Sequence, residues 1–323
     1  MSTPATSPTR STTDADAKLV RGIGLWGATL LVIGNVIGSG IFLTTGGMVA
    51  ELPSTVLVLA AWTAGGLLAM AGGLTYAEMG SMYPRSGGLA VYLAEAYGPV
   101  WGFLFGWACL LVILTGSVAT VAVGFAEYFS YFVPALGTDR ILFTLGMPWG
   151  AWSISAGQLV AAGSIVIITA INYVGVQSGT LANSVITVAK VALLVLLPLL
   201  ALVYMRVDPV FTPVVPPDAL RPLASFGVMM IAVMWTYEGW YYVAFAAGEI
   251  KDAARTVPRA LIYGTLALTA IYLSVNLAYV YALTIEEMSG VTRIAEKAVT
   301  MLIGPGGAAL VAATVVISTF GCN

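Results

Sequence analysis

The 323-residue sequence contains no histidine and little charge, since Asp, Glu, Lys and Arg together make up 9% of it. Without histidine, the chain lacks the commonest metal ligand and the usual proton relay near neutral pH. It also shows no metal-ligand cluster and no nucleophile–base pair, so we expect no metal site, no cofactor and no enzyme activity. A soluble domain usually has about 25% charged residues. The scarcity of charge, with a mean hydropathy of +0.94, therefore predicts a membrane protein.

Cysteines and basic residues are also few. Cys109 and Cys322 both lie in apolar runs, so we interpret them as small buried hydrophobic residues rather than a disulfide. The 13 Lys and Arg are scattered along the chain, and the net charge is −2. Nothing in this pattern indicates nucleic-acid binding, and the expected partners are the lipid bilayer and a small molecule.

The N-terminal 20 residues are rich in Ser, Thr, Pro and Asp. We interpret residues 1–20 as a disordered cytoplasmic tail without a cleavable signal peptide. With the N-terminus in the cytoplasm, seven basic residues lie on the cytoplasmic side and five lie outside. This small excess agrees with the positive-inside rule. We therefore expect a multi-pass protein of the plasma membrane with its N-terminus inside.

Long apolar runs follow this tail. A helix needs roughly 20 apolar residues to cross a bilayer. Runs of that size lie at about 24–50, 55–80, 99–133, 152–173, 180–205, 223–248 and 259–284, and an eighth starts near 304. The sequence predicts an all-α integral membrane protein with about eight transmembrane helices, the last one cut short.

Two of the runs are interrupted near their middle. In "LVIGNVIGSGIFLTTGG" (31–47) the interruption is Gly38-Ser39-Gly40, and in "IAVMWTYEGWYYVAF" (231–245) it is 235–239, with a charge and a glycine. An opened helix presents amides at the start of one half and carbonyls at the end of the other, which suits an anion and a cation. Paired interruptions of this kind indicate a transporter binding site between inverted repeats. A lone Gly-Ser-Gly would more often serve helix packing, but the second break favours the binding site.

Four motifs carry a family resemblance: "GNVIGSGIF" (34–42), "YPRSGGLAVYLAEAYGPVWGFLFGW" (83–107), "WTYEGW" (235–240) and "GEIKDAARTVPRA" (248–260). In this order they resemble the amino acid–polyamine–organocation (APC) superfamily, and most of all its L-type amino acid transporter branch and bacterial relatives. The resemblance implies the LeuT-type fold, which has two inverted five-helix repeats and two further helices.

The resemblance also implies a domain organisation. Residues 21–323 would form one transporter domain, with the first repeat at about 21–205 and an incomplete second repeat from about 223. "ISTFGCN" (317–323) resembles the start of the family's eighth-helix motif. The chain is therefore expected to lack the last third of the fold.

The first break is expected to hold the substrate carboxylate. The resemblance places the backbone amides of Ser39 and Gly40 on that carboxylate. Gly38 would let the chain turn, the Ser39 hydroxyl could add a hydrogen bond, and Val36 would line the pocket wall.

The second break is expected to hold the substrate ammonium through carbonyls of Trp235, Thr236 and Glu238. Trp235 matches an aromatic residue that closes over the substrate. Two roles stay open for the Glu238 side chain. It could face the pocket and select cationic side chains, or it could stabilise the first turn of the second half-helix. We favour the second role.

Lys190, in "SVITVAKVALLVL" (184–196), is a charge within an apolar helix. The resemblance implies that its amine occupies the cation site of sodium-coupled relatives. There it would bridge carbonyls of the broken first helix and a hydroxyl of the eighth, for which Ser318 is the candidate. The alternative is a lysine that extends to the membrane interface.

The expected function is sodium-independent transport of amino acids, preferably neutral ones, by exchange or proton coupling. One alternative is sodium-coupled symport with Ser318 and Thr319 as ligands. Another is transport of cationic amino acids or polyamines selected by Glu238. An amino acid is thus the expected small-molecule partner, and the sequence does not say whether an accessory subunit exists.

Overall fold

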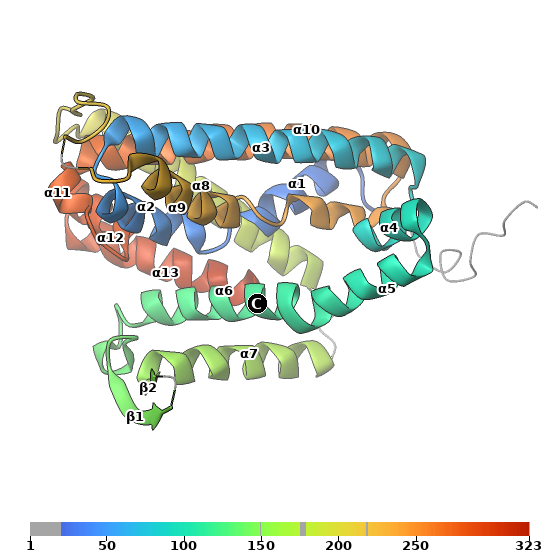
Figure 1. Cartoon of the computed structure of the whole chain (residues 1–323), viewed down its shortest axis with the longest axis horizontal. Helices are drawn as coiled ribbons and strands as arrows, with labels where there is room; N and C mark the ends of the chain where they lie inside the picture. The colour runs from blue at the N-terminus through green and yellow to red at the C-terminus, as the bar shows by residue number, and fades with distance from the viewer. Residues whose placement is uncertain (1–20, 149, 175–178, 218, 323) are drawn as a thin grey trace, which may run out of the picture.

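The helices follow the apolar runs of the sequence. The structure, a computed structural model, describes residues 21–148, 150–174, 179–217 and 219–322, so the expected N-terminal tail lies outside the described residues. The α-helices are α1 Leu25–Val36, α2 Gly40–Glu51, α3 Thr55–Met82, α4 Leu89–Tyr97, α5 Pro99–Ala108, α6 Leu114–Phe129, α7 Ala156–Val174, α8 Gly179–Val203, α9 Pro222–Thr236, α10 Ala253–Ala282, α11 Ile285–Met288, α12 Ile294–Ile303 and α13 Pro305–Cys322 (Figure 1). A π-helical turn, Cys109–Ile113, joins α5 to α6, and the 3-10 segments are η3 Pro134–Leu136, η4 Trp240–Ala244 and η5 Ala247–Glu249.

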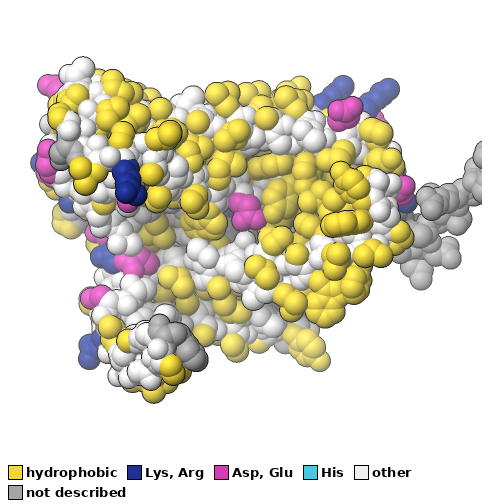
Figure 2. Space-filling view, viewed as in Figure 1, with side chains coloured by type: hydrophobic (Ala, Val, Ile, Leu, Met, Phe, Trp, Pro, Cys, Tyr) yellow, Lys and Arg dark blue, Asp and Glu magenta, His cyan; other side chains and the backbone are white. Residues whose placement is uncertain are grey.

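Within the described residues, three helical segments are long and apolar enough to cross a membrane. They are α3, the 31-residue segment Pro99–Phe129 and α10. The pair α1 and α2, which is bent by 42°, makes a fourth span if the two helices are counted as one broken helix. The apolar stretches Ala156–Ile171, Thr187–Val203 and Pro305–Phe320 are shorter. The sixth expected run is α-helical only as far as Thr236. Hydrophobic side chains cover much of the face in Figure 2, and most charged ones lie near its two ends, as in a multi-pass membrane protein.

The chain is helical as expected, but it also contains a hairpin that was not predicted. β1 (Ile141–Met147) pairs with β2 (Gly150–Ser155) in antiparallel fashion, with Thr144 opposite Ser153. The expected helix at 152–173 therefore begins only at Ala156. Apolar residues without a helical period fit a strand as well as a helix, and a glycine with a φ of 142° at Gly150 lets the chain reverse.

The helices form two packed groups. α10 lies against α3 and α1, while α2 lies against α9; α6 packs against α7 and α13. Figure 1 shows α3 and α10 side by side along one long edge and α7 beyond α6 at the other. In the first group Trp62, Tyr237 and Tyr272 are fully buried, with ring centroids 5.0–6.0 Å apart. The two broken spans lie within this first group.

Candidate functional site

The first break separates α1 from α2 by three residues. The amide of Gly38 donates to the carbonyl of Val36 at 2.8 Å, and the helix starts again at Gly40. Gly38 does not have a left-handed φ, and an added Cβ would meet only a Val121 methyl at 3.9 Å. The turn therefore does not require a glycine at Gly38, contrary to the prediction. In the first turn of α2 the Phe42 amide donates to the Ser39 carbonyl at 3.1 Å, whereas the amides of Gly40 and Ile41 precede the helical hydrogen bonds and can bind an anion.

The two breaks contact each other at Gly40, and this contact leaves no room for a side chain. An added Cβ would lie 2.6 Å from Oγ1 of Thr236, which no packed structure tolerates without movement. Gly239 makes the reciprocal approach from the second break. It has a φ of 110°, and its added Cβ would lie 2.9 Å from the carbonyl oxygen of Asn35. The absence of a Cβ at Gly40 and at Gly239 thus allows the two broken spans to pack closely against each other.

The second break is not followed by an α-helix. α9 ends at Thr236, and the chain continues through Gly239 into the 3-10 segment η4. No backbone amide of η4 donates to the Glu238 carboxylate among the described residues, so the favoured role of Glu238 as a helix-stabilising charge is not supported. The reason is geometric, because a 3-10 turn after a left-handed glycine does not present the amides of a new α-helix.

The Glu238 carboxylate instead accepts hydrogen bonds from three hydroxyl groups. Tyr241 donates to Oε1 at 2.8 Å and Tyr242 donates to the same oxygen at 3.4 Å. Ser117 of α6 donates to Oε2 at 3.2 Å. A half-buried carboxylate needs such donors, since burial without them would be costly. Through Ser117, α6 of the second group of helices contacts the second break.

A cavity of about 160 Å³ lies where the two breaks and α6 meet. All seven residues expected to bind substrate line it. The full lining comprises Asn35, Val36, Gly38, Ser39, Gly40, Leu114, Ser117, Val118, Val121, Trp235, Thr236, Glu238, Gly239 and Tyr242. The hydroxyl of Ser39 is buried and has no hydrogen-bond partner in the described part of the chain. The Ser39 side chain packs against α6, since a Cβ added at Gly124 would lie 2.7 Å from its Oγ.

Lys190 lies deep in the protein, with 1% of its side chain exposed. Its ammonium donates to the carbonyl of Gly34 at 2.7 Å and to that of Ile37 at 2.8 Å. These are carbonyls of the first break, as expected, and this burial contradicts the alternative of a lysine at the membrane interface. Lys190 does not line the cavity. Its ammonium contacts the backbone of the broken helix and does not face the cavity.

Ser318 does not form the expected bridge to Lys190. Its hydroxyl is buried, with 1% of the residue exposed, and has no hydrogen-bond partner within the described ranges. The neighbouring Thr319 hydroxyl donates to the Val315 carbonyl of its own helix at 2.7 Å. The two carbonyls of the break hold the ammonium, and they do so without help from the Ser318 hydroxyl.

Three further residues were missed by the sequence analysis. They lie on one face of α10, at positions i, i+4 and i+7. The hydroxyl of Tyr272 lies 3.1 Å from the Val36 carbonyl and 3.3 Å from the Thr236 carbonyl, so it links the breaks. Tyr279 donates to the Ile41 carbonyl at 3.1 Å, and Asn276 accepts from Thr45 at 2.7 Å. Polar residues at this spacing in an apolar helix were the available signal.

Comparison with known proteins shows the family of the chain. The model of the amino acid permease family matches residues 23–323. The chain belongs to that family. It is 32% identical over 312 residues to the serine/threonine exchanger SteT of Bacillus subtilis (strain 168), which covers 95% of this chain and 66% of the exchanger. The identity is 30% with the b(0,+)-type amino acid transporter 1 of Mus musculus, covering 87% of this chain and 55% of that protein.

A third relative is the large neutral amino acids transporter small subunit 2 of Homo sapiens. This permease is 28% identical to it, over 98% of this chain and 57% of the human protein. These relatives confirm the resemblance to the APC superfamily and its L-type branch. The permease spans between about half and two thirds of the length of these relatives.

Proposed function

We propose that this permease transports amino acids across the membrane without sodium. The observation that carries the proposal is the pair of features on the first break. The cavity lies beside Ser39 and Gly40, while the ammonium of Lys190 binds the carbonyls of Gly34 and Ile37. The cavity suits a substrate, and the Lys190 ammonium occupies the place of a metal cation.

The cavity has complementary poles for a zwitterion. At one pole the amides of Gly40 and Ile41 at the start of α2 favour a carboxylate. At the other pole the end of α9 offers the carbonyls of Trp235 and Thr236, next to the Glu238 carboxylate, and these favour an ammonium. An amino acid carries both groups at the spacing of one carbon, so it would bind across the two breaks.

Sodium independence follows from the chemistry of Lys190. A sodium ion would need oxygen ligands, and the carbonyls exposed by a helix break are suitable ones. Here two of them already accept from the buried amine of Lys190. A second cation at the same place would be repelled. Exchange and proton coupling are both compatible with this arrangement.

Transport of cationic amino acids or polyamines is a second candidate. The observation in its favour is the Glu238 carboxylate on the cavity wall, with no Lys or Arg among the residues that line the cavity. Neutral substrates remain the first candidate, because the lining is otherwise apolar or uncharged.

The wider setting is part of the same proposal. The permease would lie in the plasma membrane with its N-terminus in the cytoplasm, it would act as a transporter and not as an enzyme, and its inverted repeats would start near residues 21 and 223. One relative is named a small subunit, so association with an accessory subunit is an open part of the proposal.

Binding and uptake of radiolabelled amino acids by the purified protein in proteoliposomes would test the proposal. We expect the same signal in sodium, potassium and choline buffers, and competition by unlabelled neutral amino acids. A strict requirement for sodium would contradict it. Stronger competition by arginine or lysine than by any neutral amino acid would favour the second candidate.

A further inference from the structure

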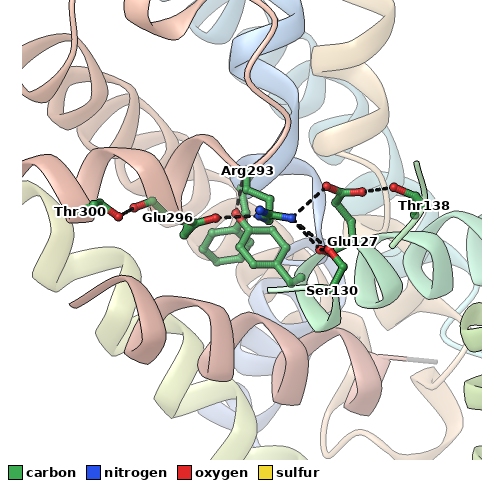
Figure 3. A network of polar contacts seen from close by, with 8 residues as sticks. Glu127, Ser130, Thr138, Arg293, Glu296 and Thr300 are labelled. Carbon is green, nitrogen blue, oxygen red and sulfur yellow. Dashed lines mark hydrogen bonds and ion pairs between the residues drawn. The ribbon is translucent and has the colours of Figure 1, made fainter. Parts of the chain in front are cut away.

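An ionic network lies beyond the cavity, at the end of α6. Arg293, directly before α12, donates from Nε to Glu296 at 2.6 Å (Figure 3). Its Nη1 lies 3.0 Å from the Ser130 hydroxyl, 3.4 Å from Oε1 of Glu127 and 3.3 Å from the Glu127 carbonyl. Thr138 also donates to Glu127. We call Glu127, Ser130, Arg293 and Glu296 the Arg293 network.

The network is better protected than an ordinary surface ion pair. The side chains of Arg293 and Glu127 are 30% and 15% exposed, and that of Glu296 is 19% exposed. One guanidinium thus joins two carboxylates and a hydroxyl. Partial burial and shared donors make such a network stronger than an isolated exposed pair.

The network lies less than two helical turns along α6 from the cavity. Val121 lines the cavity and Glu127 follows six residues later, which is about 9 Å along an α-helix. Aromatic residues pack around the same part of α6. Tyr128 donates to the Phe42 carbonyl of α2 at 2.9 Å, and the rings of Phe125 and Phe320 are 5.6 Å apart. These aromatic contacts and the Arg293 network thus lie beyond the cavity residue Val121, toward the C-terminal end of α6.

The same region connects the two groups of helices. α6 packs against α7 and α13, whereas α12 contacts α2 and α10 as well as α13. The segment just before α12 is fixed to the first broken span, because the Gly290 amide donates to the Gly46 carbonyl at 3.0 Å. Arg293 thus joins a segment attached to α2 with a helix of the other group.

We propose that Arg293 is a latch that keeps the cavity closed toward the end of α6. The cavity opens on that side only after Arg293 releases Glu127 and Ser130, which lets α6 and α2 separate. This inference rests on the proposed function in one respect, since a transporter must open its site on each side in turn. Without the latch, the population shifts toward the state that is open at the end of α6.

Side-specific labelling of one cavity residue would test the latch. The reporter is Val121→Cys in a protein whose own cysteines are removed by Cys109→Ala and Cys322→Ala. A membrane-impermeant methanethiosulfonate is applied from one side of oriented proteoliposomes or from the other. We expect Arg293→Gln to raise the labelling rate from the α6-end side at least fivefold, with no increase from the opposite side.

Arg206→Gln is the matched control, because it removes a bidentate ion pair with Glu287 that does not involve α6. It should leave both labelling rates unchanged. Equal rates for Arg293→Gln and the parent protein would overturn the proposal. An equal increase on both sides would also overturn it, since that result indicates general loosening of the fold.

Two further variants keep the test decisive if Arg293→Gln does not fold. Glu127→Gln should increase labelling on the same side, and the exchange Arg293→Glu with Glu127→Arg should return it toward the parent rate. No change in Glu127→Gln would overturn the latch. Labelling needs no substrate, so the latch is tested separately from the proposed function. If amino acids do not protect Val121→Cys, the substrate site is wrong and the latch is unaffected.

Discussion

The first break leaves an α-helix on both sides and contains no charged residue, whereas the second is α-helical only before the break and contains Glu238. The exposed carbonyls of the first break are supplied with donors from other helices, by Lys190 of α8 and by Tyr272 of α10, whose hydroxyl also lies 3.3 Å from the Thr236 carbonyl of the second break. The second break instead brings its own carboxylate and surrounds it with hydroxyl groups.

This difference assigns the two breaks to different parts of the substrate. With its carbonyls engaged by these donors, the first break presents mainly amides to the cavity, and amides suit an anion. The second break presents carbonyls and a carboxylate, which suit a cation. Variants that disturb one break and spare the other would show whether this division is correct.

The largest effect is expected from Gly40→Val, which forces the two breaks apart. The added Cβ would lie 2.6 Å from Thr236 Oγ1, and strain of this kind costs about 1–3 kcal/mol. Amino acid binding should fall about 10-fold or more, or be lost, in a protein that still inserts into membranes. Gly38→Ala is the matched control, since its Cβ has room, and it should bind almost normally. Parent-like binding by Gly40→Val would mean that the break serves only helix packing.

Lys190→Ala removes the donor of the first break. The carbonyls of Gly34 and Ile37 would lose their hydrogen bonds from the ammonium, and the loss of a buried hydrogen bond costs about 1–3 kcal/mol. We expect a lower melting temperature and weaker amino acid binding, because the break loses the geometry that presents Ser39 and Gly40. Lys251→Ala, at an exposed lysine, is the control and should change neither quantity. Unchanged binding in Lys190→Ala would remove the argument for sodium independence.

Glu238→Gln removes the charge of the second break and keeps its shape. Neutral amino acids should still bind, with a loss of about 0.3–1 kcal/mol, because the carbonyls at the end of α9 remain. Competition binding with leucine, serine, arginine and lysine would measure the change. Ser117→Ala, which removes only one hydroxyl donor to Glu238, should have a smaller effect. Selective loss of arginine and lysine binding in Glu238→Gln would favour the second candidate function.

Both breaks could be predicted from the sequence, but not how each is stabilised. Gly38-Ser39-Gly40, Glu238 and Lys190 stand out because glycine and charge are unusual within apolar runs, so composition alone locates them. The 3-10 course of η4 and the hydroxyl partners of Glu238 depend on how distant helices pack.

The contacts of single hydroxyl groups were the hardest to predict. Ser117 lies in an ordinary apolar helix and gave no signal, although it contacts Glu238. Ser318 fitted a family pattern, yet its hydroxyl makes no hydrogen bond in the part of the chain that the structure describes. A serine in a membrane helix can bond to its own backbone or remain unpaired, so its partner is decided by tertiary packing rather than by sequence.

The smallest effect is expected at an ion pair outside both breaks, between Arg206 and Glu287. The hydrogen bond from Arg206, with a further one from the Thr284 amide, lowers the pKa of Glu287 to about 2. Because this pKa lies below that of an unfolded glutamate, the pair stabilises the folded protein above about pH 4.5, and this contribution is lost as the pH falls toward 2. The pair is partly exposed to solvent, so its contribution to stability is small.

Arg206→Gln should therefore lower the melting temperature slightly at pH 7, and the difference from the parent protein should shrink as the pH falls toward 2. Amino acid binding at pH 7 should not change, because the pair lies far along the chain from both breaks and does not line the cavity. Parallel melting curves and binding isotherms of the parent and the variant would measure both quantities. A loss of binding as large as that of Lys190→Ala would show that the breaks respond to general stability. The division of carboxylate and ammonium between them would then lose its support.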